Sequence, residues 1–252
     1  MHLDEAEHIN PFAAQNPNFW MKIEHLARYL FAAEFLPRRQ CRGAHLDVGC
    51  ADGYGLSELA AALPGPLVGI DYDPALVALA RQAVPTAQVT EMDLDAAPDF
   101  AALAAAPFAS VTAFEVLEHV NDPAAVLDSV AQKMLKGGWL LASLPNPAFE
   151  QVDAAGTPVS PHHHHSFDRA AATALFEDAG FRVEDILGQG LSNRLFSRER
   201  NLASAGVLPG KPFAAPYFQE PAMVRQFAHL LAWPHRHELE KSYSFIYLCQ
   251  RR

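Results

Sequence analysis

Apolar positions along the chain follow two spacings. From Phe19 to Phe35 they recur at helical intervals, which predicts an amphipathic helix that Pro37 ends. Short apolar runs then alternate with stretches of helical spacing. Strands are predicted at Ala44–Val48, Leu67–Asp71, Gln88–Met92, Val111–Glu115 and Trp139–Ser143, and helices near Gly55–Leu63, Ala75–Ala83 and Pro123–Leu135. Because strands and helices alternate over short connections, the pattern predicts an α/β fold with a parallel sheet and helices on both faces.

End signals support two of the helices. Asp122 can cap the helix that starts at Pro123, and Gly137 with Gly138 predicts its end. Another helix is predicted from Arg169 to Ala179, between a capping Asp168 and Gly180. Strands are then predicted at Phe181–Leu187 and at Tyr243–Cys249, which is rich in β-forming residues.

Two segments fall outside this alternation. Residues 1–17 show little periodicity and are predicted to form a loose arm. Residues 188–241 are too long for a simple loop and predict an insertion, with a helix at Pro221–Leu231, that covers a substrate pocket. The predicted units are an N-terminal arm and cap helix (1–40), a core (41–187), the insertion (188–241) and the last strand of the core (242–252).

Charge and composition narrow the partners. The chain of 252 residues has a formal net charge of −10, which gives no general attraction to nucleic acid or to an anionic membrane, so a small or neutral acceptor is expected. Three cysteines without metal-type spacing fit a reducing compartment. No apolar run is long enough for a membrane span, and the acidic start lacks a signal-peptide pattern. We therefore expect a cytoplasmic protein, either a monomer or a homodimer.

The segment from His45 to Asp73 carries the strongest chemical signal. A predicted strand leads into a turn with Gly49, Gly53 and Gly55, where glycine permits close approach of the backbone to a ligand. In open α/β sheets, ligands bind beyond the carboxyl ends of the strands, where this turn lies. Asp71, at the tip of the next predicted strand, can accept hydrogen bonds from ribose hydroxyls.

The glycine spacing separates two kinds of nucleotide ligand. A dinucleotide site has the pattern G-x-G-x-x-G, which seats a pyrophosphate on a helix N-terminus. Here the pattern is G-x-x-x-G-x-G, and Asp47 precedes it. A carboxylate at this position suits a cationic ligand and would repel a pyrophosphate. Glycines that serve packing alone are the alternative.

Several motifs resemble those of class I S-adenosylmethionine (SAM) dependent methyltransferases, in the family's order. They are residues 46–55 (LDVGCADGYG), 69–73 (GIDYD), 114–123 (FEVLEHVNDP), which resembles the ubiquinone-biosynthesis O-methyltransferase branch, and 135–139 with 143–146 (LKGGW and SLPN). Residues 24–29 (EHLARY) look like a subgroup found beside sugar and polysaccharide enzymes. Ala51 departs from the pattern, since a glycine is commoner there. The resemblance implies a Rossmann-like, seven-stranded, mostly parallel sheet with an antiparallel last strand.

The resemblance also implies roles by position, with SAM as cofactor and S-adenosylhomocysteine as its product. The methionine part would meet Asp47, Gly49, Cys50 and Gly53, and Arg28 would reach its carboxylate. The ribose would bind Asp71. The remaining implied cofactor residues are Tyr72, Asp93, Leu94, Phe114 and Glu115.

Histidines are the candidate bases for an alcohol acceptor. His119 follows the fourth predicted strand, and His162 and His163 belong to a run of four histidines after the fifth. On an extended chain neighbouring side chains point to opposite faces, so at most two of the four would face one ligand. The alternatives are a structural role for His119 at the end of the sheet and, for the run, a structural loop, a wall of the acceptor pocket or a metal site. Without partner spacing for a metal, none is expected. Asn146 and the aromatics Phe19, Trp20, Phe213, Tyr217 and Trp233 are candidates for the acceptor pocket or for core.

Three functions compete. The favoured one is a SAM-dependent methyltransferase acting on a small molecule, most simply on a hydroxyl of a sugar or glycan precursor. A NAD-type oxidoreductase is disfavoured by the glycine spacing. A non-catalytic partner or regulatory protein with the SAM fold is disfavoured by the pair Asp47 and Asp71, because an inactive site needs neither.

Overall fold

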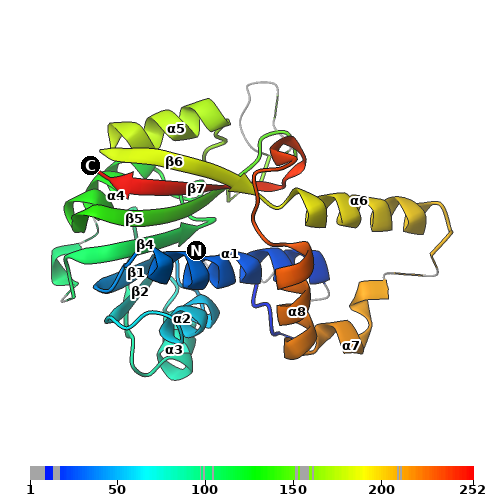
Figure 1. Ribbon diagram of the computed structural model, residues 1–252, viewed down its shortest axis with the longest axis horizontal. Helices are drawn as coiled ribbons and strands as arrows, with labels where there is room; N and C mark the ends of the chain where they lie inside the picture. The colour runs from blue at the N-terminus through cyan, green and yellow to red at the C-terminus, as the bar shows by residue number, and fades with distance from the viewer. Residues whose placement is uncertain are drawn as a thin grey trace.

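A seven-stranded mixed sheet forms the centre of the computed structural model, which describes residues 9–13, 18–96, 98, 100–103, 105–150, 153, 159–160, 162–208, 210 and 212–252 (Figure 1). The strand order is β3-β2-β1-β4-β5-β7-β6. Only β7 runs antiparallel, against both β5 and β6. The strands are β1 (Ala44–Val48), β2 (Leu67–Asp71), β3 (Gln88–Glu91), β4 (Phe108–Phe114), β5 (Met134–Pro145), β6 (Phe181–Gly188) and β7 (Ser244–Arg251). The predicted fold class is confirmed.

Helices cover both faces of this sheet. One face packs against α1 (Phe19–Arg38), α2 (Tyr54–Ala60) and α3 (Pro74–Ala83), and the other against α4 (Pro123–Gln132) and α5 (Arg169–Asp178) (Figure 1). Asp122 and Asp168 accept hydrogen bonds from backbone N–H groups in the first turns of α4 and α5, as predicted. Each face therefore buries its own apolar layer against the sheet.

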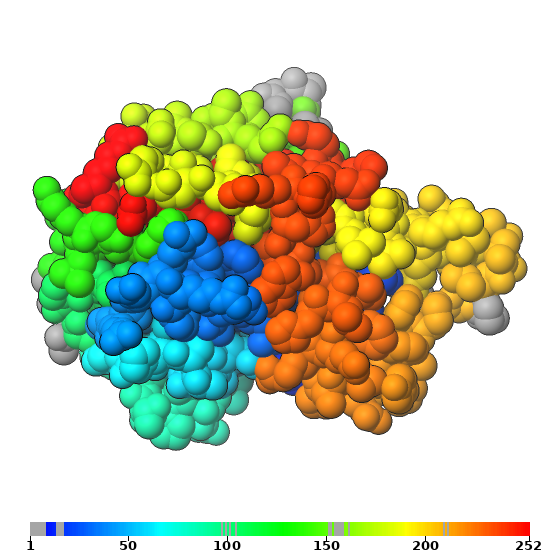
Figure 2. Space-filling view, viewed as in Figure 1, coloured from blue at the N-terminus to red at the C-terminus, as the bar shows by residue number. Residues whose placement is uncertain are grey.

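A third apolar cluster joins the start of the chain to residues 188–241. Residues 188–241 contain α6 (Gly190–Ser204), α7 (Pro216–Gln219) and α8 (Pro221–Leu231), and two short 3₁₀ helices at Pro212–Ala214 and Leu239–Lys241. A third 3₁₀ helix, at Phe100–Ala102, lies between β3 and β4. The N-terminal half of α1 packs against α8, and the buried cluster contains Phe19, Trp20, Ile23, Val224 and Ala228. Figure 2 shows α8 lying against α1, and in Figure 1 α6 projects from the molecule on the side away from the sheet. Helix α1 thus belongs to two cores at once.

Some predicted boundaries were wrong. Helix α1 continues through Pro37 to Arg38, because a proline in the last turn removes only one helical hydrogen bond. Helix α4 ends at Gln132 rather than near Leu135, and Gly137 and Gly138 lie within β5, not at a helix end. Met134 pairs with Phe108 at the start of β4, so pairing between strands decides this boundary rather than local spacing.

None of the helices in the described part of the chain has both the length and the apolar character needed to cross a bilayer.

Candidate functional site

A cavity of about 460 Å³ opens at the carboxyl ends of β1, β2, β3 and β4. Its size lies within the range for small-molecule sites. Its lining includes nine of the predicted site residues: Gly49, Asp71, Tyr72, Asp93, Leu94, Phe114, Glu115, His119 and His162. Residues far apart in the sequence therefore meet at one opening.

The turn after β1 is shaped by residues in the left-handed region. Gly49 has φ +72°, and a Cβ there would come within 2.5 Å of a methyl of Val116. Ala51 also has a positive φ, +47°, which L-residues other than glycine adopt at a cost. The N–H of Ala51 donates to Asp71 Oδ2 at 2.9 Å. Asp71 thus holds the turn as well as lining the cavity.

Asp71 reaches the cavity at the end of β2. Its Oδ1 accepts from the N–H of Asp73 at 3.0 Å, and its side chain is 8% exposed. A carboxylate oxygen has two acceptor directions, so a backbone hydrogen bond does not by itself prevent it from accepting from a ligand. Asp73 in turn caps α3 through the N–H groups of Ala75 and Leu76. Asp71 therefore presents a backbone-anchored carboxylate to the cavity.

Asp47 lies deeper than the sequence predicted. It does not line the cavity but is fully buried, and it accepts hydrogen bonds from Thr112 Oγ1 at 2.6 Å and Tyr29 Oη at 3.1 Å. Burial, with a further contribution from the charge of Asp71, raises the pKa of Asp47 to about 7 despite these hydrogen bonds. Tyr29 lines the cavity, so Asp47 reaches it through this tyrosine.

Cys50 and Gly53 also lie outside the cavity lining. The Cys50 side chain is 1% exposed and packs under Gly69, and burial raises the pKa of its thiol. Gly53 has φ +85° and sits at the start of α2, where a Cβ would come within 2.9 Å of the backbone of Ala80. Both residues therefore fix the shape of the turn through contacts outside the cavity, Cys50 with Gly69 and Gly53 with Ala80.

Arg28 is buried in an ion pair rather than exposed to the cavity. Its Nη1 lies 3.2 Å from Glu115 Oε1, and its Nε donates to Gln189 at 3.0 Å. Burial alone would raise the pKa of Glu115, but Arg28, His25 and hydrogen bonds from Ser143 and Ser244 hold it below its usual value. Glu115 has φ +54°, a rare conformation for a non-glycine residue at a site. The Glu115 carboxylate is thus a fixed negative charge at the cavity wall.

Of His119 and the histidines of the run, three line the cavity, and His163 contacts Glu150 instead. His119, His162 and His164 line the cavity. His163 does not, since its Nδ1 lies 2.7 Å from Glu150 Oε1 and its ring meets His119 edge-on at 4.8 Å. This alternation matches the expectation for an extended segment.

Sequence reasoning missed several residues of the cavity wall. His25 and Tyr29 come from α1, and Tyr54 from the start of α2. A signal was available for the first two, because residues four apart in a helix share a face. None of the described residues of 188–241 lines this cavity. Of the acceptor-pocket candidates, Phe19, Trp20 and Phe213 belong to the third apolar cluster, while Asn146 donates to the Ser242 carbonyl in a turn.

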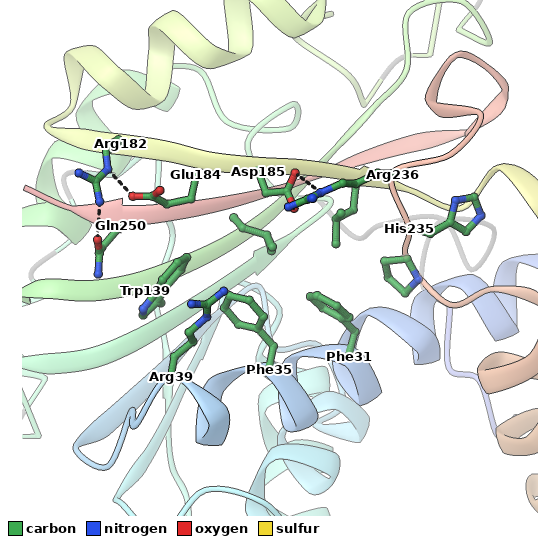
Figure 3. Close-up of a pocket in the computed structure, with 13 residues that line it drawn as sticks. Phe31, Phe35, Arg39, Trp139, Arg182, Glu184, Asp185, His235, Arg236 and Gln250 are labelled. Carbon is green, nitrogen blue, oxygen red and sulfur yellow. Dashed lines mark hydrogen bonds and ion pairs between the residues drawn. The ribbon is translucent and has the colours of Figure 1, made fainter.

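A larger groove of about 560 Å³ lies elsewhere, between α1, β6 and the segment 234–236 (Figure 3). Arg39 stacks over Phe35 and Trp139, 4.9 Å from each ring centre. Arg236 is paired with Asp185. Arg182 bonds to Glu184 and Gln250. The groove's arginines are therefore engaged within the protein, and we assign it no ligand.

Known proteins match the chain in sequence and in fold. A family described as a methyltransferase domain matches residues 19–186. A Mycolicibacterium smegmatis protein named as an S-adenosylmethionine-dependent methyltransferase is 32% identical, over 68% of this chain and 62% of its own length. A ubiquinone biosynthesis O-methyltransferase of Xanthomonas axonopodis is 34% identical, over 57% of this chain and 64% of its own. The matches thus span less than two thirds of these relatives.

A solved structure shows the same fold at low identity. It is an S-adenosylmethionine-dependent methyltransferase from Mesorhizobium loti, with a TM-score of 0.54 and 17% identity, over 87% of this chain and 98% of that one.

Proposed function

This chain belongs to the family of S-adenosylmethionine-dependent methyltransferases, and we propose that it transfers the cofactor's methyl group to a hydroxyl oxygen of a small neutral molecule. A sugar or glycan precursor is the favoured acceptor. The observation that carries the proposal is the single cavity that joins the Gly49 turn and Asp71 to His119 and His162.

The residues at the cavity fit the cofactor. Asp71 presents a carboxylate that suits ribose hydroxyls, and Tyr72 and Leu94 offer flat or apolar surface in the same cavity for an adenine ring. Glu115 supplies a fixed negative charge for a cationic ligand. We propose that Asp47 acts through Tyr29, and that Cys50, Gly53 and Arg28 act by shaping the wall.

The bound cofactor would supply the reactive methyl group, and the protein would supply orientation and a proton acceptor. His119 Nδ1 lies 2.9 Å from the carbonyl oxygen of His162, so this nitrogen carries the hydrogen and Nε2 keeps its lone pair. His119 and His162 are therefore the proposed bases for the acceptor hydroxyl. His163 contacts Glu150 instead, and we propose that it supports His119.

The charge of the cavity bears on the acceptor. Its described lining includes the carboxylates Asp71, Asp93, Asp95 and Glu115 and neither lysine nor arginine. A phosphorylated or nucleotide-linked acceptor would bring anionic groups against Asp71, Asp93 and Asp95, while Arg28, behind the wall, is already paired with Glu115. We therefore infer a neutral acceptor. The O-methyltransferase name of the Xanthomonas relative supports oxygen as the methylated atom.

Ligand binding tests the proposal before any acceptor is known. Thermal shift with SAM, S-adenosylhomocysteine and NAD should show stabilisation by the first two and none by NAD. A shift with NAD alone would reject the proposal. If SAM binds but labelled methyl is transferred to no member of a panel of neutral sugars and phenols, the non-catalytic alternative is favoured.

A further inference from the structure

The loop after β4 meets the histidine run beside the cavity. The backbone oxygen of Glu118 accepts hydrogen bonds from the N–H groups of His164 at 2.7 Å and His165 at 3.3 Å. These contacts bring together Glu118, His119 and His163, and one ligand atom from each lies within 4.8 Å of the others. Two imidazoles and a carboxylate form a common ligand set for transition metals.

The carboxylate of Glu118 has no hydrogen-bond partner among the described residues. Its side chain is 1% exposed, and neither Oε1 nor Oε2 is hydrogen-bonded. His119 Nε2 lies 3.9 Å from Oε1, too far for a hydrogen bond. Buried carboxylates are normally paired or coordinate a metal ion, because an isolated buried charge is costly. A cation bound here would supply the partner for the Glu118 carboxylate that the described residues do not.

Both histidines make, through Nδ1, the kind of outer contact that metal-binding histidines make. His119 Nδ1 contacts the carbonyl oxygen of His162 at 2.9 Å, and His163 Nδ1 contacts Glu150 Oε1 at 2.7 Å. Each contact places the ring hydrogen on Nδ1 and leaves the lone pair on Nε2. Metal-binding histidines characteristically donate their other N–H to a carbonyl or a carboxylate. Glu150 is itself fixed by a hydrogen bond from Ser166.

We propose that Glu118, His119 and His163 bind a divalent first-row transition cation, for which Zn²⁺ is the natural probe. Bonds of about 2.1 Å to a tetrahedral ion put ligand atoms about 3.4 Å apart, so the three groups must approach one another by roughly an ångström. Three protein ligands leave one position open. His119 lines the cavity, so this position faces the acceptor.

The cation would also help the acceptor hydroxyl to lose its proton. This role rests on the proposed function, whereas metal binding itself does not. A hydroxyl oxygen of the acceptor at the open position would have a lower pKa, because the cation stabilises the oxygen anion. The proton would leave to His162 or to solvent. His119 would then act as a metal ligand and His162 as the base.

Metal binding is tested on the whole protein after treatment with a chelator. Titration with Zn²⁺ by calorimetry should give one equivalent, and Co²⁺ should give visible bands of a low-symmetry site. Loss of an outer partner typically lowers metal affinity by about 10- to 100-fold. Glu118→Gln and His163→Ala each remove a ligand and should lower the Zn²⁺ affinity by at least this factor. Glu150→Gln removes an outer partner of His163 and should lower the Zn²⁺ affinity by a factor within this range.

His165→Ala is the matched control, since it removes a neighbouring histidine whose Nε2 contacts the Asn121 carbonyl instead. Its Zn²⁺ affinity should equal that of the wild type. The affinity of His163→Ala for S-adenosylhomocysteine should equal that of the wild type, which would show that the variant is folded. Absence of a stoichiometric site, or equal Zn²⁺ affinity in Glu118→Gln, His163→Ala and the wild type, overturns the metal site. Loss of nucleoside binding with Zn²⁺ binding intact would reject the proposed function instead.

Discussion

Two aspartates near the ends of adjacent strands have different tasks. Asp71 lines the cavity and holds the turn after β1, whereas Asp47 is buried and bonded to Thr112 and Tyr29. The difference arises from position in the strand, because Asp71 is the last residue of β2 and Asp47 is the last but one of β1. Substitutions at the two positions should therefore affect different properties.

Asp71→Asn should weaken SAM binding. The amide can accept through only one atom, so at least one ribose hydrogen bond is lost, at a cost of about 1–3 kcal/mol, or roughly 5- to 150-fold in Kd. Calorimetric titration measures the change, and Asp128→Asn, exposed on α4, is the control. Equal affinities for the two variants would mean that the ribose binds elsewhere.

Asp47→Asn should change the dependence of stability on pH. The folded-state pKa of about 7 exceeds the usual value of 3.8, so the folded protein holds a proton that the unfolded chain releases. In the wild type this contribution to stability is complete below about pH 4 and declines as the pH rises to about 7.

The asparagine variant lacks this titration. Relative to the wild type, its free energy of unfolding should therefore rise between pH 5 and pH 8, by an amount on the order of 1–3 kcal/mol. Urea unfolding of both proteins at the two pH values measures it. A constant difference between the two proteins would show that the Asp47 carboxyl does not titrate in this range.

Sequence alone located the glycine turn and Asp71, because a strand, a tight turn and a second strand tip are local features. It did not locate the partners of Arg28 and Asp47. Arg28 pairs with Glu115 and Asp47 with Tyr29, contacts that depend on how α1 lies on the sheet. A single sequence carries no information on which of its charged residues will face one another after folding.

At the level of elements, periodicity served best where one face of a segment is apolar. Strands β1 and β2 and helix α8 have the predicted bounds. Helix α6 was not predicted, and its sequence is mostly polar, with Gly190, Ser192 and Asn193 as its buried residues. Such a helix has little apolar stripe to detect, because only a small part of it contacts the protein.

Helix α1 depends on the aromatic cluster at its N-terminal end. Phe19 is 1% exposed, and its ring stacks on Phe213 at 4.9 Å and meets Phe227 edge-on. Phe19→Ala should destabilise the protein by about 3–5 kcal/mol through loss of buried area and a cavity. Tyr217→Ala, at a side chain that is 58% exposed, should change stability by less than about 0.5 kcal/mol.

The Phe19 effect should be confined to stability. Phe19 does not line the cavity, so Kd for SAM, measured at a temperature where Phe19→Ala is folded, should match the wild type. A large rise in Kd would show that the cluster positions His25 and Tyr29 for the ligand.

Across the whole molecule, α1 links the cavity to both cores. Its Tyr29 packs with the sheet layer, its Phe19 and Trp20 pack with α8, and its His25 and Tyr29 line the cavity. The buried Gln189 reinforces this link, because its side chain donates to the Glu24 carbonyl on α1 and to the Ala232 carbonyl after α8. Residues 188–241 therefore share a packed interior with the rest of the chain, although none of those described contacts the cavity.

This arrangement predicts a single cooperative unfolding transition that a cavity ligand shifts as a whole. Separate melting of 188–241 would expose the apolar face of α1 and should destabilise the wall that binds the ligand. S-adenosylhomocysteine at 100 times its Kd should add about 2.7 kcal/mol to the free energy of unfolding. In calorimetry the entire heat-absorption peak should move to higher temperature. A second peak at lower temperature that stays fixed with ligand would instead identify 188–241 as an independently unfolding unit, uncoupled from the cavity despite its packing on α1.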